Sequence, residues 1–215
     1  MIKTLIFDFG DVFINLDKEA PYIEMRKLGI HSFSNEMVEI NKRYETGIIS
    51  TSAFLDFYCK ICLNTSKTEL SEAWNSIILD FPEYRLKYIE ALATSKKYQL
   101  ILLSNTNDLH IEKVIKNMTI ERFLRFKNCF DAFYLSQEIH LRKPNSDIYN
   151  FVLDTHQINP KEILFIDDTK ENTESAKKLG IHSWNIIPKK EDIVDLFLLK
   201  KDLFKIDQVT NSKNT

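Results

Sequence analysis

The chain has 215 residues, which is enough for one α/β domain with a modest insertion and a substantial hydrophobic core. Its formal net charge of −2 argues against the broad basic surface that binds nucleic acid, so we expect no nucleic-acid partner. No apolar stretch approaches the roughly 18 residues of a membrane helix, and the N-terminus lacks the long apolar region of a signal peptide. We therefore expect a cytoplasmic protein without a membrane partner.

The first predicted element is a buried strand over Ile2–Phe9, an apolar run with β-branched and aromatic residues. From about residue 17 to residue 81 the pattern is then helical throughout. Helices are predicted near Glu19–Leu28, after an N-cap at Ser34, over Thr51–Leu63, and after the capping-box pattern of Ser66 and Glu69. We interpret this segment as a helical domain inserted after the first strand.

Two of the three cysteines, Cys59 and Cys62, form a C-x-x-C motif inside one of these helices. A redox or zinc pair would be supported by a preceding strand or a second such motif, and the sequence has neither. Both cysteines instead follow the helical spacing of Phe54 and Tyr58. We interpret them as small apolar residues of a packed helix.

After residue 82, helical and strand patterns alternate. Helices are predicted over residues 82–98, 109–118, 146–156 and 172–179, and strands over 99–103, 132–135, 163–166 and 183–187. Such alternation predicts an α/β fold, with a Rossmann-like parallel sheet and helices on both faces. We expect a core of residues 1–16 and 82–204, a helical cap of residues 17–81, and a flexible tail of residues 205–215.

Polar residues stand at the ends of three predicted strands: Asp8, the pair Ser104-Asn105, and the pair Asp167-Asp168. Each pattern alone is common in turns and helix caps. However, the carboxyl ends of parallel strands meet at one edge of a sheet, where ligands bind. We therefore expect all three groups to face one crevice.

The chemistry of this combination is coherent. Several carboxylates close together require a cation, and oxygen ligands suit Mg²⁺. An aspartate such as Asp8 can attack phosphorus, and a metal ion reduces the repulsion between the carboxylate and the phosphate. The Ser104 hydroxyl and the Asn105 backbone N–H suit phosphate oxygens. The ammonium of Lys143, just before Pro144, would balance the remaining negative charge.

The pattern resembles the haloacid dehalogenase superfamily. The resemblance is carried by Leu5–Val12, Leu102–Asn105, Lys143-Pro144, and Phe165–Asp168 with Asn172, in that order and around an inserted helical segment. A narrower similarity, to the bacterial α-D-glucose-1-phosphate phosphatase group and the related phosphatase domain of soluble epoxide hydrolase, is carried by Tyr44–Ser50, Leu103–His110, Tyr134–Gln137 and Leu141–Pro144. The resemblance implies a Mg²⁺-dependent phosphatase of a small phosphate ester, with a sugar phosphate as the expected substrate.

The resemblance also implies roles for individual residues. Asp8 would be the nucleophile, forming an aspartyl-phosphate, and also a metal ligand. The other implied roles are metal ligation by Asp167, Asp168 and the Gly10 carbonyl, orientation of these ligands by Asn172, phosphate binding by Ser104 and Asn105, and contact of Lys143 with both phosphate and nucleophile.

Gly10 departs from the pattern of most phosphatases in the superfamily, which have an acid–base aspartate two residues after the nucleophile. General acid–base help contributes roughly 10²–10⁴-fold to a rate, so we expect a slow enzyme or one that prefers good leaving groups. Asp11 is adjacent, but neighbouring residues of an extended strand point in opposite directions. We favour a turn-forming or capping role for Asp11 over a catalytic one.

Two other functions stay open. The glycine at position 10 is consistent with a weakly active or inactive binding or regulatory protein that keeps the fold. A haloacid dehalogenase, in which the same aspartate attacks carbon, is disfavoured by Asp167 and Asp168, because that displacement needs no metal.

Overall fold

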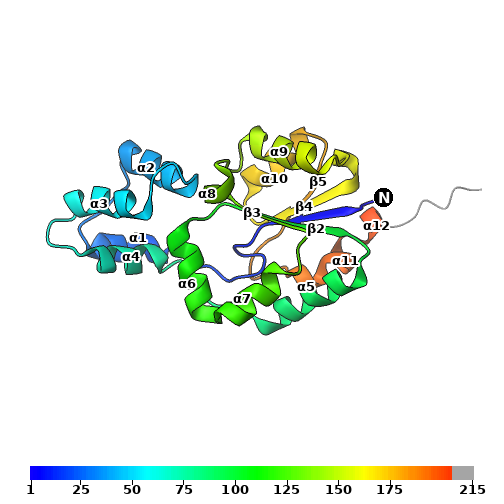
Figure 1. Cartoon of the computed structure of the whole chain (residues 1–215), viewed down its shortest axis with the longest axis horizontal. Coiled ribbons are helices and arrows are strands. Elements are labelled where there is room, and N and C mark those ends of the chain that lie inside the picture. Colours follow the sequence, from blue (N-terminus) through cyan, green and yellow to red (C-terminus); the bar gives the residue numbers. More distant parts are fainter. Residues whose placement is uncertain (205–215) are drawn as a thin grey trace, which may run out of the picture.

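The computed structural model describes residues 1–204, so the tail predicted for residues 205–215 lies outside the described residues. Five parallel strands form one sheet in the order β3-β2-β1-β4-β5 (Figure 1). They are β1 (Thr4–Phe7), β2 (Gln99–Ser104), β3 (Ala132–Leu135), β4 (Ile163–Asp167) and β5 (His182–Asn185). The predicted parallel α/β fold is therefore confirmed.

Four strands differ from the prediction at their ends, β2 and β4 by one residue each and β1 and β5 by more. The first strand ends at Phe7 instead of Phe9, and the last runs over His182–Asn185 instead of residues 183–187. The apolar run continues past β1 because Phe9 is buried although it belongs to the loop that follows. Asp8 is therefore the first residue of that loop, so the direction of its side chain is not set by the alternation of side chains along a strand.

Helices cover both faces of the sheet because successive strand residues point in opposite directions. Leu5 and Phe7 of β1 join the core that includes Leu86, whereas Ile6 joins the core that includes Ile148. Figure 1 shows α5, α7 and α11 along one face and α9 and α10 along the other. The helices after residue 82 are α5 (Glu83–Ser95), α6 (Asp108–Met118), α7 (Ile120–Lys127), α8 (Ser136–Ile139), α9 (Ser146–His156), α10 (Lys170–Lys178), α11 (Leu196–Leu199) and α12 (Lys201–Phe204), with 3₁₀ turns at Pro160–Glu162 and Ile193–Asp195.

The helical segment after β1 has a hydrophobic cluster of its own, which includes Tyr44, Phe54, Tyr58 and Trp74. It consists of α1 (Ala20–Lys27), α2 (Asn35–Glu45), α3 (Thr51–Ile61) and α4 (Lys67–Asn75), and it lies at one end of the molecule in Figure 1. The predicted N-cap of α2 and the predicted capping box of α4 are both present.

The two connections between this segment and the sheet run side by side, because Leu16 is bridged to Ile78. The Asp17 backbone N–H also donates to the Ile77 carbonyl at 2.9 Å.

Cys59 lies in α3 and Cys62 follows it as the C-cap, both as free thiols. Among residues 1–204, no helix is both long and apolar enough to cross a membrane.

Candidate active site

The carboxyl edge of the sheet brings together the polar residues that follow β1, β2 and β4. Phe7 is paired with Ile166 on β4, so Asp8 comes level with Asp167, and the Asp8 N–H donates to the Ile166 carbonyl at 2.8 Å. Ser104 is the last residue of β2, the neighbour of β1 on its other side. Parallel pairing thus places these side chains at one edge, as the order of the strands requires.

Three carboxylates form a compact cluster at this edge. Oxygen atoms of Asp8, Asp167 and Asp168 lie within 4.8 Å of one another. Burial, together with the charge of Asp8, raises the pKa of Asp168 and raises that of Asp167 to about 6. Burial and mutual repulsion thus disfavour the negative charge of these carboxylates. A hard divalent cation such as Mg²⁺, which prefers oxygen ligands, would compensate that charge.

Lys143 supplies a positive charge inside this cluster. Its side chain is 1% exposed, and its Nζ lies 2.6 Å from Oδ2 of Asp167 and 2.9 Å from Oδ1 of Asp8. Burial alone would lower the pKa of Lys143, but the two carboxylates outweigh burial and raise it. The ammonium is therefore held in its charged form between the two aspartates.

Two asparagines hold this arrangement in place. Asn172 donates from Nδ2 to Oδ1 and Oδ2 of Asp167, at 3.1 and 3.0 Å, and the Thr169 N–H donates to the same carboxylate at 2.7 Å. Asn105 donates from Nδ2 to the Lys143 carbonyl at 2.8 Å and accepts from the Lys143 N–H at 2.9 Å. The Asn105 side chain thus fixes the main chain of the lysine, a contact between the residue that follows β2 and a later loop that the sequence did not predict.

Gly10 and Asp11 lie in the tight turn after β1. A Cβ atom at Gly10 would stand 2.7 Å from Cδ1 of Leu16, so the end of the Leu16 side chain would have to shift to admit one. Asp11 has a φ of 53°, and its carboxylate accepts from the Leu16 N–H at 3.0 Å. This geometry agrees with a turn-forming role for Asp11.

Lys18 is a site residue for which the sequence offers no signal. Its Nζ is in direct contact with Oδ2 of Asp168 and lies 3.2 Å from Oδ2 of Asp11. The side chain is half-exposed and comes from the connection that leads into α1. Lys18 therefore links the carboxylate cluster to the segment that leads into the inserted helices.

Comparison with known proteins agrees with this arrangement. The sequence model of the family described as haloacid dehalogenase-like hydrolase matches residues 5–186. The chain belongs to the haloacid dehalogenase-like hydrolase family. A D-ribitol-5-phosphate phosphatase of Bacteroides thetaiotaomicron is 27% identical to it over 193 residues, which are 86% of this chain and 91% of that protein.

Two further proteins are similar to this chain along most of their length. A phosphorylated carbohydrates phosphatase of Thermotoga maritima is 22% identical over 186 residues, 84% of this chain and 82% of that protein. The crystal structure of a haloacid dehalogenase family enzyme from Bacteroides thetaiotaomicron, in complex with magnesium and inorganic phosphate, is 35% identical. It superposes with a TM-score of 0.79 over 92% of this chain and 100% of that chain.

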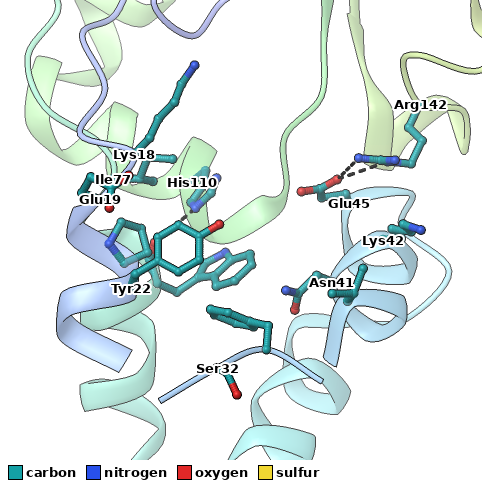
Figure 2. Close-up of a pocket in the computed structure, with 14 residues that line it drawn as sticks. Lys18, Glu19, Tyr22, Ser32, Asn41, Lys42, Glu45, Ile77, His110 and Arg142 are labelled. Carbon is teal, nitrogen blue, oxygen red and sulfur yellow. Dashed lines mark hydrogen bonds and ion pairs between the residues drawn. The ribbon is translucent and has the colours of Figure 1, made fainter. Parts of the chain in front are cut away.

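This hydrolase has a cavity of about 670 Å³ beside the carboxylate cluster. The cavity lies between α1 and α4 on one side and α2 on the other (Figure 2). Lys18 and Arg142 line it. Lys18 contacts Asp168, and Arg142 immediately precedes Lys143 in the chain. Lys18 thus lies both on the wall of the cavity and against the carboxylate cluster, and the cavity is of a size that holds a small organic molecule.

Proposed function

We propose that this hydrolase is a Mg²⁺-dependent phosphatase that removes phosphate from a small metabolite, with a sugar or polyol phosphate as substrate. The observation that supports this most directly is the position of Lys143 between Asp8 and Asp167, with Asp168 in the same cluster. A positive charge fixed beside a carboxylate nucleophile is the arrangement that transfer of a phosphate dianion requires.

In the proposed reaction, a carboxylate oxygen of Asp8 attacks phosphorus and the bond from phosphorus to the leaving oxygen breaks. The leaving oxygen takes a proton from a water molecule and departs as an alcohol, which leaves hydroxide to be neutralised by the acidic phosphate released in the second step. Water then attacks the phosphorus of the aspartyl-phosphate, which releases inorganic phosphate and regenerates Asp8. Lys143 and Ser104 would stabilise the phosphate oxygens through both steps.

Mg²⁺, held by Asp8, Asp168, the Gly10 carbonyl and Asp167, directly or through water, would neutralise the charge of phosphate and carboxylates. Both oxygens of Asp167 already accept hydrogen bonds, so Asn172 and Thr169 would keep that ligand oriented. No side chain at Gly10 can protonate the leaving oxygen. We therefore expect that, with poor leaving groups, turnover is roughly 10²–10⁴-fold slower than in an enzyme with an acid at that position.

We also propose that residues 17–81 act as the substrate-selecting cap. Three observations support this division: the separate hydrophobic cluster of α1–α4, the paired connections at Leu16 and Ile78, and the cavity that these helices line. The substrates printed in the names of the two phosphatase relatives, D-ribitol 5-phosphate and phosphorylated carbohydrates, support the substrate class.

The test is phosphate release from a panel of sugar and polyol phosphates, measured with and without Mg²⁺. We expect Mg²⁺-dependent turnover in the natural protein and none in Asp8→Asn, because an amide cannot act as the nucleophile. Asp154→Asn, an exposed residue of α9, is the matched control and should keep full activity. Unchanged turnover in Asp8→Asn would contradict the mechanism.

Two further outcomes would identify the alternative functions. Release of halide from a 2-haloacid without any phosphate release would indicate a dehalogenase. Binding of Mg²⁺ and sugar phosphate without release of either product would indicate a binding protein that has kept the fold and lost turnover.

A further inference from the structure

One wall of the cavity presents an amide whose orientation is fixed from behind. The Tyr58 hydroxyl donates to Oδ1 of Asn41 at 2.7 Å. Tyr58 is fully buried in the hydrophobic cluster of the inserted helices, and burial raises the pKa of its hydroxyl, which stays protonated and acts as the donor. Because Oδ1 accepts this bond, the Nδ2 of Asn41 is turned away from Tyr58.

The amide N–H groups of Asn41 are therefore free to bind a ligand. Among residues 1–204, no hydrogen bond joins Nδ2 of Asn41 to another group, and Asn41 lines the cavity. An amide nitrogen only donates, so its partner must be an oxygen or nitrogen acceptor. A substrate hydroxyl is such an acceptor, and the orientation held by Tyr58 removes the entropic cost of arranging the amide.

The opposite wall is aromatic. Figure 2 shows Tyr22 on one side of the cavity and Asn41 on the other. The rings of Tyr22 and Phe33 meet edge to face, with centroids 5.5 Å apart and planes at 88°. The face of a ring is negative and attracts the weakly positive hydrogens of C–H bonds, so this wall suits the carbon side of a hydroxylated chain.

The aromatic rings around the cavity pack largely against one another. Trp74 stacks against His110 at 5.6 Å with an interplanar angle of 15°, and Phe54 lies against the same indole at 4.9 Å. Tyr22 and Phe33 are perpendicular to each other. The cavity thus places an aromatic wall opposite a hydrogen-bond donor, an arrangement that suits the carbon and hydroxyl sides of a polyhydroxylated chain.

We propose that Asn41 is a specificity-determining residue that donates to a hydroxyl oxygen of a polyol or sugar phosphate, and that Tyr58 is the positioning residue that orients its amide. The carbon chain of the substrate lies along the wall formed by Tyr22 and Phe33. This inference rests on the proposed phosphatase function, whose cavity it assigns to one class of organic group.

The first experiment compares three phosphate esters: D-ribitol 5-phosphate, adenosine monophosphate, and p-nitrophenyl phosphate, which has no hydroxylated chain. Asn41→Leu removes the donor and is expected to raise KM for ribitol 5-phosphate about 3- to 10-fold with kcat unchanged. This change corresponds to the loss of one neutral hydrogen bond. The kcat/KM for p-nitrophenyl phosphate should stay within about twofold. Asn150→Leu, at an exposed position of α9, is the matched control.

Tyr58→Phe tests the positioning role. It should raise KM for ribitol 5-phosphate less than Asn41→Leu does, again without a change in kcat. Since Tyr58 acts through Asn41, the double variant Asn41→Leu/Tyr58→Phe should lose no more than Asn41→Leu alone. Additive losses would show that Tyr58 only supports the packing of α2 and α3, and they would overturn its assigned role.

Failure of this inference differs from failure of the proposed function. Equal losses on all three esters, or no loss on ribitol 5-phosphate, would overturn the role of Asn41, and a loss confined to adenosine monophosphate would assign the amide to a base. If the natural protein releases no phosphate from any ester, the proposed function fails. Calorimetric binding of ribitol 5-phosphate to Asp8→Asn, with and without Asn41→Leu, then tests Asn41 alone: 3- to 10-fold weaker binding, on the order of one hydrogen bond, supports it, and equal binding overturns it.

Discussion

Asn105 illustrates how one side chain can serve the site through another residue. Its amide makes two hydrogen bonds to the main chain of Lys143, at 2.8 and 2.9 Å. The main chain of Lys143 is thereby tied to the end of β2, and its ammonium reaches Asp8 and Asp167. An amide that accepts and donates at once is well suited to this task, whereas aspartate in its place would leave the Lys143 carbonyl without a donor.

His110 gives a prediction at the same scale. Burial in α6 lowers the pKa of its imidazole to about 4 from an ordinary value of 6.5. Between these two values the unfolded chain takes up a proton that the folded protein does not bind. The contribution of His110 to stability is therefore complete above pH 6.5 and is lost progressively as the pH falls toward about 4, by up to about 3 kcal/mol.

Urea unfolding across this pH range measures the effect. His110→Phe keeps an aromatic ring against Trp74 but cannot titrate, so its free energy of unfolding should fall less with decreasing pH than that of the natural protein. The same pH dependence in both proteins would show that His110 is protonated equally in the folded and unfolded states.

The C-terminal end of α2 is one of the places where the inserted helices contact the rest of the chain. Ser136 of α8 donates from Oγ to the Glu45 carbonyl at 2.6 Å, and the Glu45 carboxylate pairs with Arg142 at 2.9 Å. Nδ1 of His140 lies 2.8 Å from the Thr46 carbonyl. These contacts all fall between β3 and Lys143, so the position of α2 is coupled to the loop that carries the lysine.

Gly47 is predicted to be the most sensitive position of this contact. It has a φ of +65°, and a Cβ atom there would stand 2.1 Å from the carbonyl oxygen of Gln137, so Gly47→Ala must displace the backbone. We expect a loss of about 2–4 kcal/mol in the free energy of unfolding, together with a lower kcat/KM. Gly29→Ala is the matched control, because Gly29 has a φ of +93° with nothing within 4 Å. It should cost only about 1 kcal/mol, from backbone strain.

Denaturant unfolding of both glycine variants separates backbone strain from the lost contact. Equal losses at the two positions would mean that the approach of Gly47 to Gln137 is easily relaxed and does not fasten α2.

At the scale of the whole molecule, the carboxylate cluster stores repulsion that ligand binding can relieve. Asp8 follows β1, and Asp167 is the last residue of the neighbouring strand β4. Folding brings both close to Asp168, although burial raises the pKa of Asp167 and Asp168. Lys143 and Lys18 offset part of this charge in the absence of metal. A cation that binds only the folded state adds stability by mass action.

Magnesium should therefore raise the melting temperature. At a concentration about 100 times its dissociation constant it would add about 2.7 kcal/mol, which corresponds to about 5–11 °C for a protein of this size. Thermal unfolding with MgCl₂, compared with NaCl at equal ionic strength, measures this shift. Asp168→Asn should lose most of it, while Asp154→Asn should keep it. A shift of equal size in Asp168→Asn would place the cation elsewhere.

The sequence by itself determined the class of fold and the carboxylate edge of the site. Strand and helix periods are local, so the five parallel strands and most helices were predicted within a few residues. The helix α7 was missed because Thr119, with a φ of +73°, separates it from α6 without a glycine or proline. Parallel strands end at one edge, and for that reason the sequence predicted that Asp8 and Asp167 face one crevice.

Only the tertiary structure decided the contacts between residues far apart in the chain. The clamp of Asn105 on Lys143, the contact of Lys18 with Asp168, and the orientation of Asn41 by Tyr58 have no local signal. Each depends on how helices and loops pack after they have formed, and hydrogen-bond geometry is specific to a few tenths of an ångström. A pattern of residue types thus placed Asp8, the proposed nucleophile, whereas packing decided which side chains surround it.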